Sequence, residues 1–482
     1  MLSRFLAIPF LALLTLYSSN HIKADADKEA VARLDKSWSG FMAGLEQAKE
    51  SLVNPKYFPP ESTDRNLAEG YRYMLGHISR MIELEMRQDP EFPEFHRAVD
   101  MLRKWTAENP DTMYISAALD ADAYYRVTGQ AANTLEWKTS ERGVVGPKAP
   151  RLVTFQTTTD YPGRTGDLKE MALCNSQTLD FANSFSLQLD KDNRFEILIG
   201  PERPKDYQGN FILSQKEMLC PATGKTELRK ATGLTVRKIF SDWENEKTLE
   251  LDIVRLDKEG HSRPPITSEF VSQKLDKIAK ELPNQIRFWN YLQEYAMELR
   301  ADVNGDGVRP MPVNDINQPA LPFTAGGAAG AKQYYAAGKF ELKEDEALVI
   351  KVTAPVEPHY VGFQLGTLWF EGPDQQNYVS SLSGHQLPVS SDGSRYYIVA
   401  AKDPGYQGWV STTGLLEGTH SMRFVFRNDT EKKQLPETSA FLVNLEDIET
   451  FLPSDTPKIT TKQRAEEIAV RQKHIKYRWR GY

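Results

Sequence analysis

Four residues in the C-terminal part of the chain have the side-chain types that acid–base chemistry requires: His385, Tyr360, Asp403 and Arg423. An unperturbed histidine titrates at about pH 6.5 and can act as an acid or a base, and an arginine can hold a carboxylate or an oxyanion. A hydrolase or lyase acting on a glycan or an ester would need these groups to converge on one point. The alternative is structural, because Asp403 opens an Asp-Pro-Gly turn and His385 can brace its own loop.

Aromatic and amide side chains of the same region are candidate binding residues, namely Trp369, Gln386 and Trp409. Indole planes beside amides suit a sugar or another ring-shaped ligand. The two tryptophans can equally be core residues. Sites usually lie on loops that a rigid sheet carries, so the clustering of these residues favours a binding site.

The run Asp302-Val-Asn304-Gly-Asp306-Gly matches the first six positions of a calcium loop, with oxygen ligands at positions 1, 3 and 5. Position 12 should be a bidentate acid, but it is Val313, and Asp315 comes two residues late. An Asx-rich turn that caps the end of a helix is the alternative. A calcium ion here would be structural, and no other cofactor is predicted.

Signatures of common enzyme classes are absent from the sequence, including HExxH, GxSxG, GxxxxGK[ST] and GxGxxG after a strand. Paired carboxylates or a His/Tyr pair can lie far apart in sequence, so missing motifs do not decide whether the protein is an enzyme. The net charge of −7 argues against a nucleic-acid binder, which needs a basic face.

The first residues have the pattern of a signal peptide. Arg4 supplies a positive charge, Phe5–Tyr17 is apolar, and Ala24-Asp-Ala26 fits a small-residue cleavage site. A membrane anchor is the alternative, but the apolar run is shorter than the roughly 20 residues of a membrane span. We therefore expect residues 1–26 to be removed and the protein to be periplasmic or secreted.

The chain has two cysteines, Cys174 and Cys220. An even number in an exported chain predicts a disulfide between them, with two buried thiols as the alternative. Their separation lacks the CxxC spacing of a metal site.

Periodicity predicts a helical and antiparallel β part over residues 27–300. Thr63 or Asp64 can cap a helix that ends at the prolines near residue 90. Further helices are predicted for Phe95–Trp105, Met113–Tyr125 and Ser268–Arg300. Strands are predicted for Leu152–Thr158, for a hairpin of Ser184–Leu189 with Arg194–Ile199, and for a hairpin of Leu234–Phe240 with Leu249–Leu256.

The remaining chain divides into three parts. Residues 301–330 are rich in Gly, Pro, Asn and Asp and are predicted to form a linker loop. Residues 331–452 alternate as antiparallel strands of a β-sandwich-like domain. Residues 453–482 form a basic helical tail, which could contact an anionic membrane or polysaccharide, or dock on the acidic body of the protein itself.

Several segments together resemble an uncharacterised bacterial family catalogued as domain of unknown function 1214. They are LAEGYRYMLGHISRMIELEM, ENPDTMYISAALDADAYYRVTG, DYQGNFILSQ, SDWENE, GKFELKEDEALVIKV, YVGFQLGTLWFE, SSLSGHQ and DPGYQGWVSTTG. The resemblance runs from about Asn66 to Arg427. It implies a helical and β N-terminal part followed by a β-sandwich-like domain, and it implies no reaction.

The sequence thus predicts an α+β fold with antiparallel sheets in both halves. The first functional hypothesis is an exported protein that binds a carbohydrate or small molecule, in a cleft of the C-terminal β domain or between the halves. The second is a hydrolase or lyase that uses the His/Tyr/Asp/Arg set. The third is an envelope-associated scaffold whose basic tail makes a peripheral membrane contact.

Overall fold

The computed structural model of the chain describes residues 28–104, 108–139, 142–172, 176–220, 223–321 and 332–479. The predicted signal peptide, residues 1–26, lies outside the described residues. Within the described stretches, no helix is long and apolar enough to cross a membrane.

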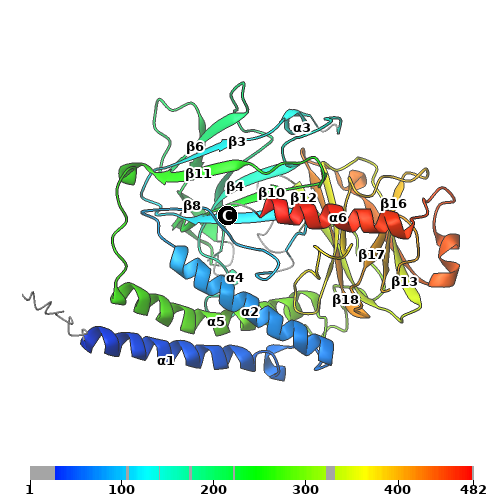
Figure 1. Cartoon of the computed structure of the whole chain (residues 1–482), viewed down its shortest axis with the longest axis horizontal. Helices are drawn as coiled ribbons and strands as arrows, with labels where there is room; N and C mark the ends of the chain where they lie inside the picture. Colours follow the sequence, from blue (N-terminus) through cyan, green and yellow to red (C-terminus); the bar gives the residue numbers. More distant parts are fainter. Residues whose placement is uncertain are drawn as a thin grey trace, which may run out of the picture.

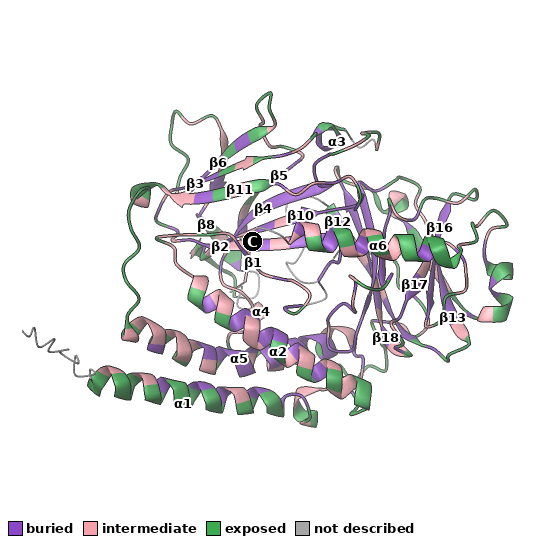
Figure 2. Cartoon of the chain, viewed as in Figure 1, coloured by how far each residue is buried: buried purple, intermediate pink, exposed green. Residues whose placement is uncertain are grey.

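Three long helices form one layer beneath the sheets (Figure 1): α1 (Lys28–Glu50), α2 (Asp64–Arg87) and α5 (Ser268–Met297). The predicted cap of α2 is confirmed, because the Thr63 hydroxyl accepts a hydrogen bond from the Asn66 amide at 3.1 Å. α1 crosses α5 closely at Gly44, where an added methyl group would lie 2.6 Å from the Ala279 carbonyl oxygen. α1 is otherwise largely exposed (Figure 2).

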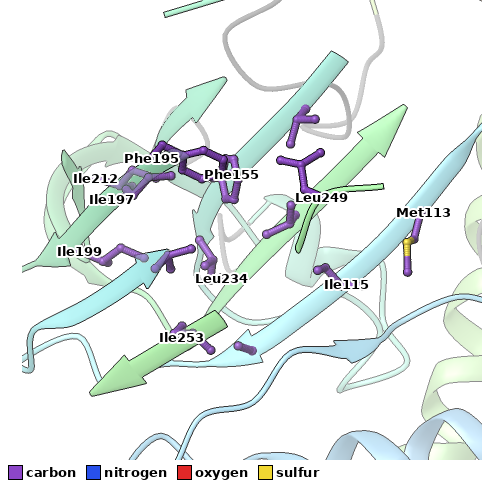
Figure 3. Close-up of a cluster of buried hydrophobic side chains, with 14 of the residues drawn as sticks. Met113, Ile115, Phe155, Phe195, Ile197, Ile199, Ile212, Leu234, Leu249 and Ile253 are labelled. Carbon is purple, nitrogen blue, oxygen red and sulfur yellow. The ribbon is translucent and has the colours of Figure 1, made fainter. Parts of the chain in front are cut away.

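The N-terminal β part consists of two sheets packed face to face. The larger sheet has the order β1 (His96–Arg97), β2 (Thr112–Ala118), β10 (Gly233–Ile239), β4 (Leu152–Thr158) and β5 (Thr178–Asn183). The smaller has the order β11 (Glu250–Arg255), β3 (Tyr125–Gln130), β6 (Arg194–Gly200) and β7 (Asn210–Leu213). Figure 3 shows apolar side chains of both sheets meeting, among them Phe155, Leu234 and Ile197. This core holds the N-terminal half together.

The C-terminal half is a sandwich of two four-stranded sheets. One has the order β12 (Lys332–Glu341), β18 (Glu417–Phe426), β14 (Tyr360–Gly366) and β15 (Ser381–Ser383). The other has the order β17 (Trp409–Ser411), β16 (Ser394–Ala400), β13 (Glu346–Thr353) and β19 (Glu437–Asn444). Buried side chains of both sheets, such as Phe424 and Val399, share a second core. The predicted α+β class with antiparallel sheets is confirmed.

The remaining elements are short. They are the hairpin of β8 (Gln215–Cys220) and β9 (Lys225–Lys230), the helices α3 (Leu135–Lys138) and α4 (Lys169–Ala172), and the 3-10 helices Pro55–Tyr57, Leu256–Lys258, Lys432–Gln434 and Leu445–Phe451. Cys220 is buried and is not a free thiol. Cys174 lies outside the described residues, so the predicted pairing of the two cysteines stays a prediction.

The C-terminal helix α6 (Thr461–Arg478) lies across both halves (Figure 1, red). Ile475 belongs to the N-terminal core, whereas Ile468 packs against the C-terminal core. The Arg471 guanidinium donates to the carbonyl oxygens of Gln375 at 3.0 Å and Ser381 at 2.9 Å. Much of the basic tail therefore docks on the chain itself.

Two predicted helices are wrong. Met113–Tyr125 contains β2 and a turn that leads into β3. Along β2, Met113 and Ile115 enter the core while Tyr114 faces away, so the true period is two residues. Phe95–Trp105 contains only the short strand β1 among its described residues, and Trp105 lies outside them.

Both predicted hairpins are also wrong, although most of their strands are correct. Ser184–Leu189 is a turn and coil segment, because β5 ends at Asn183. β10 and β11 belong to different sheets, and each pairs with strands distant in sequence. Turn residues predict a reversal of the chain, but they do not say which strands pair after it.

The stretch predicted as a linker runs partly beside β12. Val313 and Ala320 form bridges with Lys339 and Tyr335 of that strand. Residues 322–330 of the predicted linker lie outside the described residues.

Lys238 is fully buried in the N-terminal core, on the same face of β10 as Leu234 and Val236. Its ammonium donates to the Leu249 carbonyl oxygen at 3.0 Å and to the Thr248 hydroxyl at 3.1 Å. Burial lowers the pKa of Lys238 to about 7.

We expect the free energy of unfolding to rise with pH above about 7, because the folded state then releases a proton that the unfolded lysine keeps up to about pH 10. The slope from this residue is at most about 1.4 kcal/mol per pH unit. Urea unfolding of the native chain and of Lys238→Met at about pH 6.5 and about pH 8.5 measures it. The variant should lack this component of the rise, and equal slopes for the two proteins would contradict the prediction.

Candidate functional site

A cavity of about 520 Å³ lies between the two halves of the chain. We call it the central cavity. Its walls come from β2 and β10 of the larger N-terminal sheet, from the helices α2 and α5, and from β12 and β18 of the C-terminal sandwich. Clefts between domains are common ligand sites, and this volume is within the range of about 300 to 1,000 Å³ typical of small-molecule pockets.

Strand alternation explains why the sheets bring polar side chains to the walls of the central cavity. On β2, Met113 and Ile115 point into the N-terminal core, so Tyr114 and Ser116 point into the central cavity. On β12, Ala336 enters the C-terminal core and its neighbour Tyr335 lines the central cavity. Each sheet therefore has one apolar face for its own core and one mixed face for the cavity.

Two arginine–tyrosine pairs lie in this cavity, one from each half. Arg237 of β10 is the cross-strand partner of Tyr114, and its guanidinium lies 5.9 Å from the centre of that ring. Arg423 of β18 is the partner of Tyr335, at 5.5 Å. Burial lowers the pKa of Arg237, and the nearby positive charge of Arg423 lowers it further. The guanidinium groups of Arg237 and Arg423 are thus close enough for their charges to interact.

The arginines are oriented by neutral amides. Arg237 donates to the Gln156 side-chain oxygen, and Arg423 donates to that of Gln364. Among the described residues, the charged and titratable groups near Arg237 are Tyr114, Tyr335 and Arg423, and no carboxylate forms an ion pair with it. An arginine keeps its charge in proteins, so the cavity wall here has positive charge and free space next to it.

The carboxylates of the cavity wall have partners of their own. Glu108 accepts hydrogen bonds from the Gly372 amide at 3.1 Å, and burial raises its pKa while nearby Lys104 lowers it. Asp160 forms an ion pair with Arg164. Much of the remaining lining is apolar or aromatic, including Trp289, Leu292, Met297 and Phe370. The cavity thus combines buried arginines with apolar and aromatic walls.

Of the four predicted catalytic residues, Arg423 alone lines the central cavity. Tyr360 is fully buried behind it, where its hydroxyl donates to the Asp111 carboxylate at 2.6 Å and accepts from the Asn109 amide at 2.9 Å. Burial raises the pKa of Tyr360 well above its ordinary value, and the Asp111 charge adds to this. Tyr360 is therefore a neutral hydrogen-bonding group at the junction of the halves.

His385 lies apart from Arg423 and Tyr360. Its ring is 43% exposed, and its Nε2 lies 3.6 Å from the Asp242 carboxylate. Burial lowers the pKa of His385, whereas Asp242 favours its charged form. Gln386 braces the same loop, because its side-chain oxygen accepts from the Ser383 amide at 2.9 Å.

Asp403 and Trp409 form a third environment, next to α6. Asp403 is 2.9 Å from the Arg464 guanidinium and accepts from the Gly405 amide at 2.8 Å. The same guanidinium lies 4.9 Å from the centre of the Trp409 ring, whose indole nitrogen donates to the Ala400 carbonyl oxygen at 3.0 Å. The structural interpretation of Asp403 as a turn residue fits this geometry, and both side chains anchor the C-terminal helix.

Trp369 joins the sandwich to the helix layer. Its indole nitrogen donates to the Asn66 carbonyl oxygen at 2.8 Å, and its ring stacks on Tyr73 at 5.4 Å. A methyl group at Gly70 would lie 2.5 Å from the ring, so glycine allows α2 to approach. The faces of this tryptophan are thus covered by the protein, as the core interpretation of the residue requires.

No interaction between described residues brings His385 or Asp403 to Arg423 or Tyr360. Arg237, Tyr114 and Tyr335 are not among the site residues predicted from the sequence. A signal was present, since Arg237 stands within an otherwise strand-like run and Tyr114 alternates with apolar residues. What the sequence did not reveal is that these two strands face the C-terminal half.

A second cluster of polar groups lies outside the cavity, in the turn that follows α5. Glu298, Asp302 and Asp306 each offer a carboxylate oxygen, and these oxygens lie within 4.8 Å of one another. Asp302 accepts hydrogen bonds from the amides of Gly305 at 2.6 Å and Gly307 at 2.8 Å. The predicted ligand Asn304 is exposed in the same turn. An acidic triad suited to a cation is therefore present.

A broad hollow of about 940 Å³ lies over β3, β6 and β11. Its lining includes the exposed carboxylates Glu196, Glu250 and Asp252 and the exposed Arg194. Water already solvates these groups, and none of the predicted site residues lies there. The central cavity is for these reasons the better candidate site.

No protein-family model matches this chain, and no curated protein does either. Among solved structures, the chain is similar to a putative uncharacterized protein from Burkholderia cenocepacia, with a TM-score of 0.66 and 23% identity over 86% of this chain and 99% of that one. It also matches the VPA0106 protein from Vibrio parahaemolyticus, with a TM-score of 0.39 and 12% identity over 83% of this chain and 100% of that one. The first similarity concerns the fold alone. The resemblance to domain of unknown function 1214 stays a prediction.

We expect Tyr360→Phe to lower the free energy of unfolding by about 1 to 3 kcal/mol, because it removes a donor from the buried Asp111 carboxylate. Tyr397→Phe is a matched control. Tyr397 is also fully buried, but its hydroxyl has no hydrogen-bond partner among the described residues, so its removal should cost little. Urea denaturation of the three proteins tests this, and equal losses for the two variants would contradict it.

Proposed function

We propose that this protein binds a small molecule with an anionic group and an apolar body in the central cavity. The observation that carries the proposal is the meeting of the two pairs, Arg237 with Tyr114 and Arg423 with Tyr335, across the cavity between the halves. The sequence predicted a carbohydrate or small-molecule ligand in the C-terminal domain or between the halves. The position of the cavity supports the second location.

The chemistry of the lining supports an acid as the ligand. A guanidinium offers a planar set of donors that fits a carboxylate or phosphate in two parallel hydrogen bonds. A neutral amide holds Arg237, so a ligand anion would meet its charge without displacing a buried carboxylate. Trp289 and Phe370 offer aromatic contact surface to the apolar part of the ligand.

The hydrolase or lyase hypothesis lacks a comparable observation. It requires His385, Asp403, Tyr360 and Arg423 at one point, and their hydrogen-bond partners place them in three environments. The scaffold hypothesis rests on the basic tail. Arg464, Arg471 and Arg478 are buried against the chain, so a membrane contact would depend on the exposed lysines of α6.

A screen of matched ligands tests the proposal. Aromatic and aliphatic carboxylic acids should raise the melting temperature of the protein, and the corresponding primary amides should not. Calorimetry of the tightest acid should then show about 10- to 100-fold weaker binding to Arg237→Gln, since a hydrogen bond to a charged group contributes about 1.5 to 3 kcal/mol.

Arg126→Gln is the matched control. Arg126 stands on β3 of the other N-terminal sheet, pairs with Glu259 at 2.6 Å, and does not line the central cavity. Its substitution should leave the affinity unchanged. Equal binding of acids and amides, or equal effects of the two arginine substitutions, would overturn the proposal. Binding of neutral saccharides alone would favour the carbohydrate ligand instead.

We also propose a structural role for the acidic triad after α5, as a site for a cation. Glu298, Asp302 and Asp306 do not line the central cavity. An ion bound there would not touch the ligand, but it would hold the end of a helix that does line the cavity.

A further inference from the structure

Glu298 is the unusual member of the acidic triad, because it is fully buried. It closes α5 as its C-cap, with a left-handed φ of 48°. Its Oε1 accepts a hydrogen bond from the backbone amide of Asn304 at 2.8 Å. Its Oε2 is buried and has no hydrogen-bond partner among the described residues.

A buried carboxylate oxygen without a donor is costly, and a bound cation removes this cost. The triad geometry places a Glu298 carboxylate oxygen within 4.8 Å of oxygens of Asp302 and Asp306. One ion at about 2.4 Å from all three oxygens requires them to lie about 4.2 Å apart or less, which the exposed Asp302 and Asp306 side chains can reach by a small movement. The unsatisfied oxygen and the triad therefore point to the same ligand.

We infer that the turn binds Ca²⁺ and that Glu298 supplies the carboxylate that the loop lacks at position 12. This inference rests on the proposed structural cation site, and it names calcium as the ion and Glu298 as the replacement for the missing acid. In the regular loop the last acid follows the turn. Here Val313 stands at that position, its backbone bridges to Lys339 of β12, and the acid comes from the helix before the turn.

The ligand set favours calcium over other common ions. Asp302, Asn304, Asp306 and Glu298 offer only oxygen, which excludes the nitrogen and sulfur donors that zinc prefers. Three carboxylates outweigh the charge of a divalent ion. Ca²⁺ accepts six to eight oxygens in irregular geometry, whereas Mg²⁺ requires a near-ideal octahedron and keeps its waters.

The ion would tie two segments together. Glu298 ends α5, whose residues Trp289 and Leu292 line the central cavity. The turn continues to Asn314, whose amide and side chain donate to carbonyl oxygens of β12, each at 2.7 Å. Calcium would thus fix the chain between the helix and the strand that carries Tyr335.

Calorimetry on the full chain, freed of metal with EDTA, tests the inference. Titration with CaCl₂ should show one site, with a Kd on the order of 10⁻⁴ M or tighter, as in extracellular calcium modules. Millimolar Ca²⁺ should raise the melting temperature, and the same concentration of Mg²⁺ should raise it less. Glu298→Gln keeps the shape and the acceptor for the Asn304 amide, and it should weaken calcium binding at least about tenfold.

Asp306→Asn is a second variant, at an exposed position, and should weaken binding similarly. Asp192→Asn is the control. Asp192 lies in another acidic turn, and the carboxylates of that turn do not form a cluster of three. Unchanged affinity in Glu298→Gln, with the variant folded, would overturn the role of Glu298. Binding of Mg²⁺ or Mn²⁺ without Ca²⁺ would overturn the choice of calcium alone, and absence of any divalent binding would overturn the cation site as well.

Discussion

The carboxylate of Asp111 must be satisfied where the two halves of the chain meet, and the arrangement around it follows from this requirement. A charge buried without donors would be strongly destabilising. The donors come from both halves, since Trp243 donates to one oxygen at 2.9 Å and Tyr360 to the other at 2.6 Å. Burial raises the pKa of this carboxyl, whereas the Tyr360 hydrogen bond and the charges of Arg478 and Arg471 lower it. One side chain thereby joins the N-terminal sheets, the sandwich and the C-terminal helix.

The helix α6 is held at this junction by the same charges. The guanidinium groups of Arg471 and Arg478 lie 4.6 Å and 4.9 Å from the centre of the Trp243 ring, and Arg478 donates to the Pro110 carbonyl oxygen at 2.5 Å. Together with the hydrogen bonds of Arg471 to Gln375 and Ser381, these contacts tie both halves to one helix. On the other side of the junction, the polar faces of β10 and β18 cannot form a dry core, because each carries an arginine. The space between them is the central cavity, which belongs to neither half alone.

Much of the fold could be predicted because its signals are local. The cap at Thr63, the strand Leu152–Thr158 and the strands of the C-terminal half depend on neighbouring residues, and the structure has them where the sequence indicated. The errors concern non-local information. The alanines near the end of β2 favour a helix by propensity, yet sheet pairing on both sides of the strand overrides it. Likewise, β10 and β11 were correct as strands, but their partners lie far away in sequence.

The candidate site was less predictable for a related reason. His385 and Asp403 are loop residues with reactive side chains, but each lies beside a charged side chain outside its own segment, Asp242 and Arg464. Arg237 looked like an ordinary strand residue, and only the docking of the sandwich makes it face Arg423. The acidic turn shows the same limit. The regular loop has its last acid after the turn, whereas the buried Glu298 lies one helical turn before it. A charge whose partner belongs to another segment cannot be interpreted from its own neighbourhood, and in this protein the proposed ligand and the proposed ion both depend on such charges.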